Sequence, residues 1–180
     1  MISHEYKCIF IHISRTAGTS MEQTICGKNW WEIDKNTKHI TANKAKELYK
    51  DYWDSYFKFS FVRNPWDRII SCYHHMWYKN THKDQDLEYM LNNFKTPPWE
   101  QDGILEYVDI LGDELNFIGR YENLLDDFNF VKQKIGLNKQ LSHMGKGDRD
   151  KNYQKYYTDK SITLVENMYK KSIEKFNYTF

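Results

Sequence analysis

The chain has 180 residues, of which 40% are hydrophobic and 17% aromatic, and its formal net charge is +1. This length suits one domain, and the aromatic content excludes a disordered or low-complexity chain. The balanced charge gives no extended basic field for nucleic acid, so any anion site has to be local. Three scattered cysteines, Cys8, Cys26 and Cys72, fit neither a disulfide framework nor a paired zinc site, and we expect reduced thiols. We place a single domain over residues 1–180.

The apolar run near the N-terminus is short. It extends from Cys8 to Ile13, includes a histidine, and is far below the ~20 apolar residues of a membrane span. No other stretch approaches that length, so we expect a soluble, cytoplasmic protein without a membrane span.

The first half of the chain alternates strand and helix patterns. The predicted elements are a strand over Lys7–Ile13, a loop over Ser14–Thr19, a helix over Ser20–Cys26, a helix over Thr41–Tyr49, a strand over Tyr56–Val62 and a helix over Pro65–Tyr78. Asn64 before Pro65 is a strong helix start, because asparagine caps the unpaired amides and proline fits the first helical position.

The second half continues the alternation. It predicts a helix over Asp86–Phe94, a loop over Thr96–Gly103, a strand over Asn116–Tyr121, a helix over Leu124–Ile135 that stops at Gly136, a basic loop over Ser142–Asp150 and a helix over Asp159–Phe176. Strands separated by helices predict an α/β fold with a central parallel sheet flanked by helices. In such sheets ligands bind beyond the carboxyl ends of the strands.

The loop after the first strand, SRTAGTS at 14–20, has the composition of a phosphate site. Small residues, hydroxyls and one cation precede a helix N-terminus, where backbone amides and the helix dipole attract anions. The alternative is an ordinary turn in which Thr19 or Ser20 only caps the helix. The Walker pattern GxxxxGK[ST] is absent, which disfavours ATP hydrolysis.

The second strand runs into RNPWDRIIS at 63–71 and predicts a second oxyanion site. Arg63 is placed at the strand end, and Arg68 and Ser71 share a helix face. A planar guanidinium binds phosphate through two hydrogen bonds at once. The alternative for Arg68 is a solvated surface charge.

The segments FIHISRTAGTS and FSFVRNPWDRIISCYHH closely resemble the two signatures of sulfotransferases that use 3′-phosphoadenosine 5′-phosphosulfate (PAPS). They look most like the branch that contains carbohydrate sulfotransferases. Similarity continues through HITA at 39–42, FIGRYENL at 117–124 and the Tyr156–Tyr157 stretch that leads into the terminal helix. The resemblance implies a single-domain, P-loop-like three-layer fold and a transferase that needs no metal.

The resemblance also implies which residues bind the donor. The 5′-phosphosulfate would be held by Arg15, Thr16, Ala17, Gly18, Thr19 and Ser20, the 3′-phosphate by Arg63 and Ser71, and the adenine side by Tyr121. Lys146 and Arg149 fall where related proteins close a cationic loop over the cofactor; a solvated loop is the alternative.

The chain departs from the family pattern at two positions. Arg15 replaces the family's catalytic lysine, and Ala17 replaces the usual first glycine of the loop. Arg15 can still donate to the departing anion, but a rigid guanidinium fork does not imitate a compact ammonium.

Transfer to a hydroxyl also needs a base. His39 matches a histidine between the two signatures of related proteins and is our candidate, ahead of five of the six other histidines. Of these, His12 lies inside a strand as a core residue would, one of His74 and His75 is placed to face the cleft, and His82 and His143 lie in loops.

The acceptor is predicted to be a small molecule or glycan that carries a hydroxyl or an amine. Several aromatic residues could stack on sugar rings, although most aromatic residues of a small domain belong to the core; the tryptophans among them are Trp30, Trp31, Trp66, Trp77 and Trp99. Two alternatives stay open: a PAPS-binding or PAP-binding module that has lost catalysis, and a small-molecule kinase on a related scaffold. The sequence predicts no particular oligomeric state.

Overall fold

The computed structural model describes residues 1–75, 86–93, 106–142 and 149–180. At its centre a four-stranded sheet has the order β1–β2–β3–β4, formed by Ile2–Ser3, Cys8–Ile11, Phe57–Val62 and Phe117–Arg120. β2, β3 and β4 are parallel, as the sequence predicted. The two-residue β1 pairs antiparallel with β2 at the edge and was not predicted, because two residues carry no periodicity.

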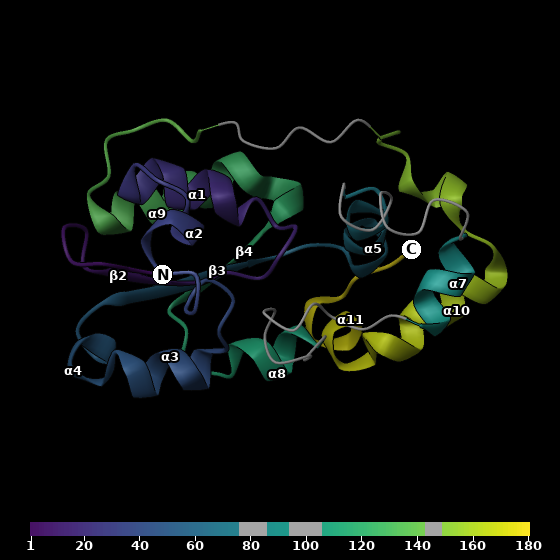
Figure 1. The fold of residues 1–180 in the computed structure, drawn as a ribbon, viewed down its shortest axis with the longest axis horizontal. Helices are drawn as coiled ribbons and strands as arrows, with labels where there is room; N and C mark the ends of the chain where they lie inside the picture. Colours follow the sequence, from purple (N-terminus) through teal and green to yellow (C-terminus); the bar gives the residue numbers. More distant parts are fainter. Residues whose placement is uncertain (76–85, 94–105, 143–148) are drawn as a thin grey trace.

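Helices cover both faces of the sheet, and a further group lies beyond the carboxyl ends of the strands (Figure 1). One face carries α1 (Gly18–Cys26), α2 (Trp30–Ile33) and α9 (Leu124–Ile135), and the other carries α3 (Ala42–Leu48), α4 (Lys50–Trp53) and α8 (Tyr107–Leu111). Beyond the strand ends lie α5 (Pro65–Tyr73), α7 (Leu87–Asn92), α10 (Asp159–Met168) and α11 (Lys170–Phe176). Short 3₁₀ turns, η2 (Tyr121–Asn123) and η3 (Tyr153–Tyr156), complete the described elements. The predicted three-layer α/β class is confirmed.

Strand alternation divides the core between the two faces. Cys8 and Phe10 of β2 pack with the α1 and α9 side, whereas Ile9 and Ile11 pack with the opposite layer. Every residue of β2 is buried, as expected for a strand covered on both faces. The three cysteines are free thiols, with Cys8 buried and the other two half-buried.

Two helix predictions need correction. The predicted helix over Pro65–Tyr78 ends at Tyr73, where α5 stops, and the part from residue 76 on lies outside the described residues. The predicted helix over Asp159–Phe176 is broken at Tyr169 into α10 and α11, because Tyr169 leaves the helical region at φ −123° and ψ 23°. The predicted loop over Thr96–Gly103 falls outside the described residues. Among the described residues, none of the helices has the length and apolar character needed to cross a bilayer.

Candidate functional site

The loop between β2 and α1 is built from two left-handed residues. Arg15 has φ 63° and Ala17 has φ 67°, and α1 begins at Gly18, two residues before the predicted start. Ala17 caps the helix without a side-chain hydrogen bond, and the first turn carries no acidic residue. The positive end of α1 is therefore not offset by its own side chains and suits an anion. The positive φ of Ala17 explains why related proteins usually have glycine at this position, since a Cβ is disfavoured in the left-handed conformation.

Gly18 is required by the close approach of His12. A Cβ on Gly18 would lie 2.0 Å from His12 Cδ2, which no side chain tolerates. The ring of His12 therefore supports the loop from inside, and the first turn of α1 rests directly on it.

The hydroxyls of the loop have different environments. Thr16 is fully buried and its Oγ1 donates to the carbonyl of Ile13 at 2.7 Å. Thr16 can therefore bind an anion through its main chain rather than through its hydroxyl. Thr19 is half-buried and Ser20 is buried, so the predicted binding residues of this loop are gathered at one helix start.

Arg63 lies at the end of β3 as predicted and is 4% exposed. Its Nη1 donates to the carbonyl of Arg15 at 2.9 Å, its Nε donates to Asp67 Oδ2 at 2.8 Å, and its guanidinium carbon lies 3.8 Å from the centre of the Tyr121 ring. Tyr107 donates its hydroxyl to the carbonyl of Arg63 at 2.8 Å. The two predicted anion-binding segments, at 14–20 and 63–71, and Tyr121 therefore meet at the Arg63 guanidinium.

Arg149 reaches the same place from a distant part of the chain. Its Nη2 lies 2.5 Å from Asp67 Oδ1, so the Asp67 carboxylate is shared between Arg63 and Arg149. The predicted partner Lys146 falls outside the described residues, which resume at residue 149.

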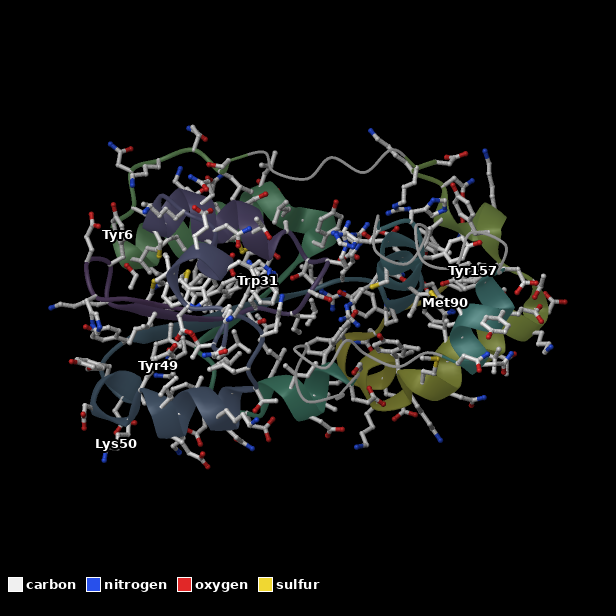
Figure 2. All side chains as sticks on the ribbon, in the orientation of Figure 1. Tyr6, Trp31, Tyr49, Lys50, Met90 and Tyr157 are labelled. Atoms are coloured by element: carbon white, nitrogen blue, oxygen red, sulfur yellow. The ribbon has the colours of Figure 1, made fainter. Side chains whose placement is uncertain are left out.

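Arg15 and Ser71 are in direct contact. Arg15 Nε donates to Ser71 Oγ at 3.0 Å, which joins the first loop to the helix of the second motif. Burial lowers the pKa of Arg15, and the neighbouring positive charges of Arg63 and Arg149 lower it further. Like charges collected this closely are stabilised by a bound anion. Figure 2 shows nitrogen atoms gathered beside α5, where the strands end.

Arg68 is not a solvated surface charge, which corrects that alternative. It is 2% exposed, its Nε donates to the carbonyl of Ser14 at 3.0 Å, and its Nη1 donates to the hydroxyl of Tyr169 at 2.6 Å. Arg68 therefore links the loop to the C-terminal helices instead of serving as a second phosphate-binding group beside Ser71.

His39 lies close to the start of α1, against His12. Its Nδ1 is 3.0 Å from the carbonyl oxygen of His12, and the two rings are 4.5 Å apart. The ring of Trp31 meets His39 edge-on at 5.8 Å and is 41% exposed (Figure 2 labels Trp31 on α2). Trp30 and Trp66 are buried core residues, whereas Trp77 and Trp99 fall outside the described residues.

The other histidines have different surroundings. His12 is buried as predicted, at 3% exposure. His74 caps the end of α5 and its ring packs against Tyr156 at 4.8 Å. His75 is exposed, and both His82 and His143 fall outside the described residues.

Three charged residues of this region were missed in the sequence. They are Glu22 and Lys38, which form a buried ion pair at 2.5 Å, and Asp67, which bridges two arginines. The available signals were weak: Glu22 follows Met21 on the buried side of a helix, and Lys38 directly precedes the candidate base. Within the described ranges, no group of three or more His, Cys, Asp or Glu side chains has an arrangement that could hold a metal ion.

Comparisons with known proteins support the similarity of the two motifs. The family model described as "Sulfotransferase family" matches residues 1–103. An uncharacterised protein of Archaeoglobus fulgidus is 35% identical over 111 residues, which cover 59% of this chain and 89% of that protein. No solved structure matches the chain significantly.

Proposed function

Because the chain belongs to the sulfotransferase family, we propose that it transfers a sulfuryl group from PAPS to a hydroxyl or amine acceptor and releases adenosine 3′,5′-bisphosphate. The observation that carries this proposal is that Arg63 donates to the Arg15 carbonyl and shares the Asp67 carboxylate with Arg149, so that three arginines gather where the β2–α1 loop meets the start of α5. Asp67 pairs with Arg63 and Arg149, and the charge of the nearby Arg15 adds to theirs, which leaves an excess of positive charge that suits a ligand with phosphate at both ends.

The residues present fit such a donor. The N-terminus of α1, formed by Gly18, Thr19 and Ser20, would bind the 5′-phosphosulfate, and Thr16 and Ala17 would add main-chain groups of the same loop. Arg63 and Ser71 would bind the 3′-phosphate, Arg149 would close over the donor from its contact with Asp67, and Tyr121, stacked on Arg63, would contact the base. When bound, PAPS supplies an activated sulfuryl group on a phosphate leaving group.

Arg15 and His39 take the chemical roles in this proposal. Arg15 stands beside the leaving phosphate and donates hydrogen bonds to the negative charge that grows there as the bond breaks. The acceptor proton passes to His39, whose Nδ1 must carry hydrogen because a carbonyl oxygen only accepts. Nε2 of the neutral ring is then the nitrogen that takes the proton.

One observation favours a second candidate, a module that binds PAPS or its product without turnover. Arg15 replaces the family's lysine, and its Nε is already engaged by Ser71 on the side of the 3′-phosphate. A guanidinium held there stabilises the bound nucleotide without following the charge of the transition state.

Titration calorimetry and a transfer assay test the proposal. The protein should bind adenosine 3′,5′-bisphosphate more tightly than ATP with Mg²⁺, and it should transfer label from PAPS to a member of a panel of sugar, phenol and amine acceptors. Preference for ATP with Mg²⁺ would indicate a kinase. Tight bisphosphate binding with no transfer to any acceptor would indicate the binding module.

His39→Ala tests the base separately. We expect turnover to fall by at least ~100-fold, the usual contribution of a general base, while affinity for the bisphosphate stays within about threefold. The measurement is kcat with the best acceptor together with calorimetric affinity. Equal kcat in variant and parent removes His39 from the mechanism.

A further inference from the structure

Glu22 is a carboxylate with no exposed surface, directly below the loop. Its Oε1 is 2.6 Å from His12 Nδ1, and its Oε2 accepts from Lys38 Nζ at 2.5 Å. The backbone amide of Trp30 donates to the same Oε2 at 3.1 Å. Burial raises the pKa of Glu22, but the hydrogen bonds from His12 and Lys38 and the charge of Lys38 outweigh burial and lower this pKa to about 2. Glu22 is therefore ionised, and His12 Nδ1 is a donor.

Lys38 pairs with this carboxylate and directly precedes the candidate base, His39, in the chain. It is 2% exposed, and its ammonium also donates to Asn29 Oδ1 at 2.5 Å. The same Asn29 oxygen caps α2 by accepting from the amide of Trp31. Lys38 Nζ lies 5.6 Å from the centre of the Trp31 ring, whose edge contacts His39.

The network surrounds His39 from two sides. His12 supplies the carbonyl that accepts from His39 Nδ1, and Lys38 fixes the preceding residue of the chain. Burial lowers the pKa of His12, and Lys38 opposes the attraction of Glu22 for a proton on that ring. A neutral His12 therefore lies 4.5 Å from His39, where an imidazolium would repel a proton arriving on the base.

We propose that Glu22 and Lys38 are positioning residues that hold His39 with Nδ1–H on the His12 carbonyl and so assign proton acceptance to Nε2. The use of Nε2 in catalysis rests on the proposed sulfuryl transfer. The tautomer itself is a property of the folded chain and is measured without any substrate.

A buried ion pair by itself is weak support for stability, so the pair has to be tested separately from folding. Removing one partner leaves an uncompensated charge and destabilises the protein, whereas replacing both by uncharged residues of similar size is often tolerated. The variant Glu22→Gln/Lys38→Met keeps an acceptor for His12 and the length of the lysine, but it removes the anchor beside His39.

The first test uses the unaltered protein. Two-bond ¹H–¹⁵N correlation spectra at about pH 9, well above the ordinary histidine pKa, distinguish a ring protonated at Nδ1 from one protonated at Nε2. We expect His39 to be protonated at Nδ1, and His39→Ala assigns the signal. A ring protonated mainly at Nε2 overturns the proposal.

The second test compares the double variant with a matched surface pair. In Glu22→Gln/Lys38→Met we expect a mixture of His39 tautomers, and a kcat lowered about tenfold or more with the KM for PAPS within about threefold of the parent. The control Asp113→Asn/Lys175→Met removes an exposed pair, 90% and 42% accessible, and should leave both readouts unchanged. A folded double variant with the parent's tautomer and kcat overturns the positioning role.

The two proposals fail in different ways. If the parent transfers no sulfate from PAPS but His39 loses its single tautomer in the double variant, the function is wrong and the positioning stands. If transfer occurs and the tautomer is unaffected by the double variant, the positioning is wrong and the function stands.

Discussion

Arg63 joins three parts of the candidate site through one guanidinium group. It holds the carbonyl of Arg15, pairs with Asp67 and stacks on Tyr121. A ligand phosphate at this place therefore meets a cation whose orientation is already fixed from three directions, and little side-chain entropy remains to be lost on binding.

Replacing Arg63 by alanine should weaken binding of adenosine 3′,5′-bisphosphate by about 2–4 kcal/mol, because one partner of a charge-assisted pair is removed. Arg63→Lys keeps the charge but loses the planar fork, and its affinity should fall between those of parent and alanine variant. Calorimetry measures the affinity, and a thermal melt shows whether the fold is retained. Parental affinity in a folded Arg63→Ala would remove Arg63 from the 3′-phosphate site.

Arg15 is one of the two positions at which the chain departs from the family pattern. If it stabilises charge on the bridging oxygen, Arg15→Ala should lower turnover by more than ~100-fold and bisphosphate affinity much less, because that charge develops in the transition state. Arg15→Lys decides the geometry: a faster variant means that arginine is a compromise, and a fall of about tenfold means that the site is built around the guanidinium. Parent, Ala and Lys forms with one common rate would exclude a catalytic role.

The site residues differ in how far the sequence reveals them. Arg63 and the 14–20 loop follow strand ends, and the asparagine before Pro65 caps α5 by accepting from Trp66 N, so local rules predict them. The bridge from Asp67 to Arg149 joins residues 82 positions apart, and no local pattern encodes it. The φ of Ala17 was equally hidden, since alanine gives no signal for a left-handed conformation.

At the scale of elements, helix ends could be predicted only where the sequence carries a residue that stops a helix. The helix over Leu124–Ile135 has the predicted bounds because Gly136 ends it in the left-handed conformation. The break at Tyr169 has no glycine or proline to mark it, and the apolar positions continue across it. Tertiary packing places the break: Tyr169 is fully buried and accepts from Arg68 through its hydroxyl.

The junction of β2 and α1 should make the protein sensitive to acid. Glu22 takes up a proton at its ordinary pKa of 4.5 when unfolded and at about 2 when folded, so its stabilising contribution is full above about pH 4.5 and is lost as the pH falls toward 2. His12 acts in the same direction, because burial lowers its pKa from 6.5 and the unfolded chain binds that proton first. Stability should therefore decrease on acidification from neutral pH.

Thermal melts from pH 7 to pH 3 measure this effect. The melting temperature of the parent should fall more steeply below pH 5 than that of Glu22→Gln/Lys38→Met, which has no carboxylate to protonate at this position. The surface variant Asp113→Asn/Lys175→Met serves as the control. Parallel pH profiles for parent and double variant would show that Glu22 does not carry the acid sensitivity.

At the scale of the whole molecule, the C-terminal part completes both the sheet and the site. β4 pairs with β3, and Phe128 and Val131 of α9 cover the same core as Phe59. Arg149 and Tyr169 then reach back to Asp67 and Arg68 of the second motif. We propose on these contacts that the sulfotransferase-like domain spans residues 1–180, beyond the 103 residues that the family model matches.

A fragment of residues 1–105, which retains both motifs, tests that extent. It would leave the outer edge of β3 unpaired and would expose Phe59 and Phe61, which are fully buried in the whole chain. Exposed apolar side chains beside an open strand edge favour association over folding, so the fragment should show no cooperative melt by circular dichroism and little dispersion in ¹H–¹⁵N spectra. It should also fail to bind adenosine 3′,5′-bisphosphate, because it lacks Arg149, and because Arg68, which holds the loop through Ser14, loses its Tyr169 partner. A fragment that melts cooperatively and binds the nucleotide with the affinity of the whole chain would place the domain boundary near residue 103 and leave the C-terminal part a separate unit.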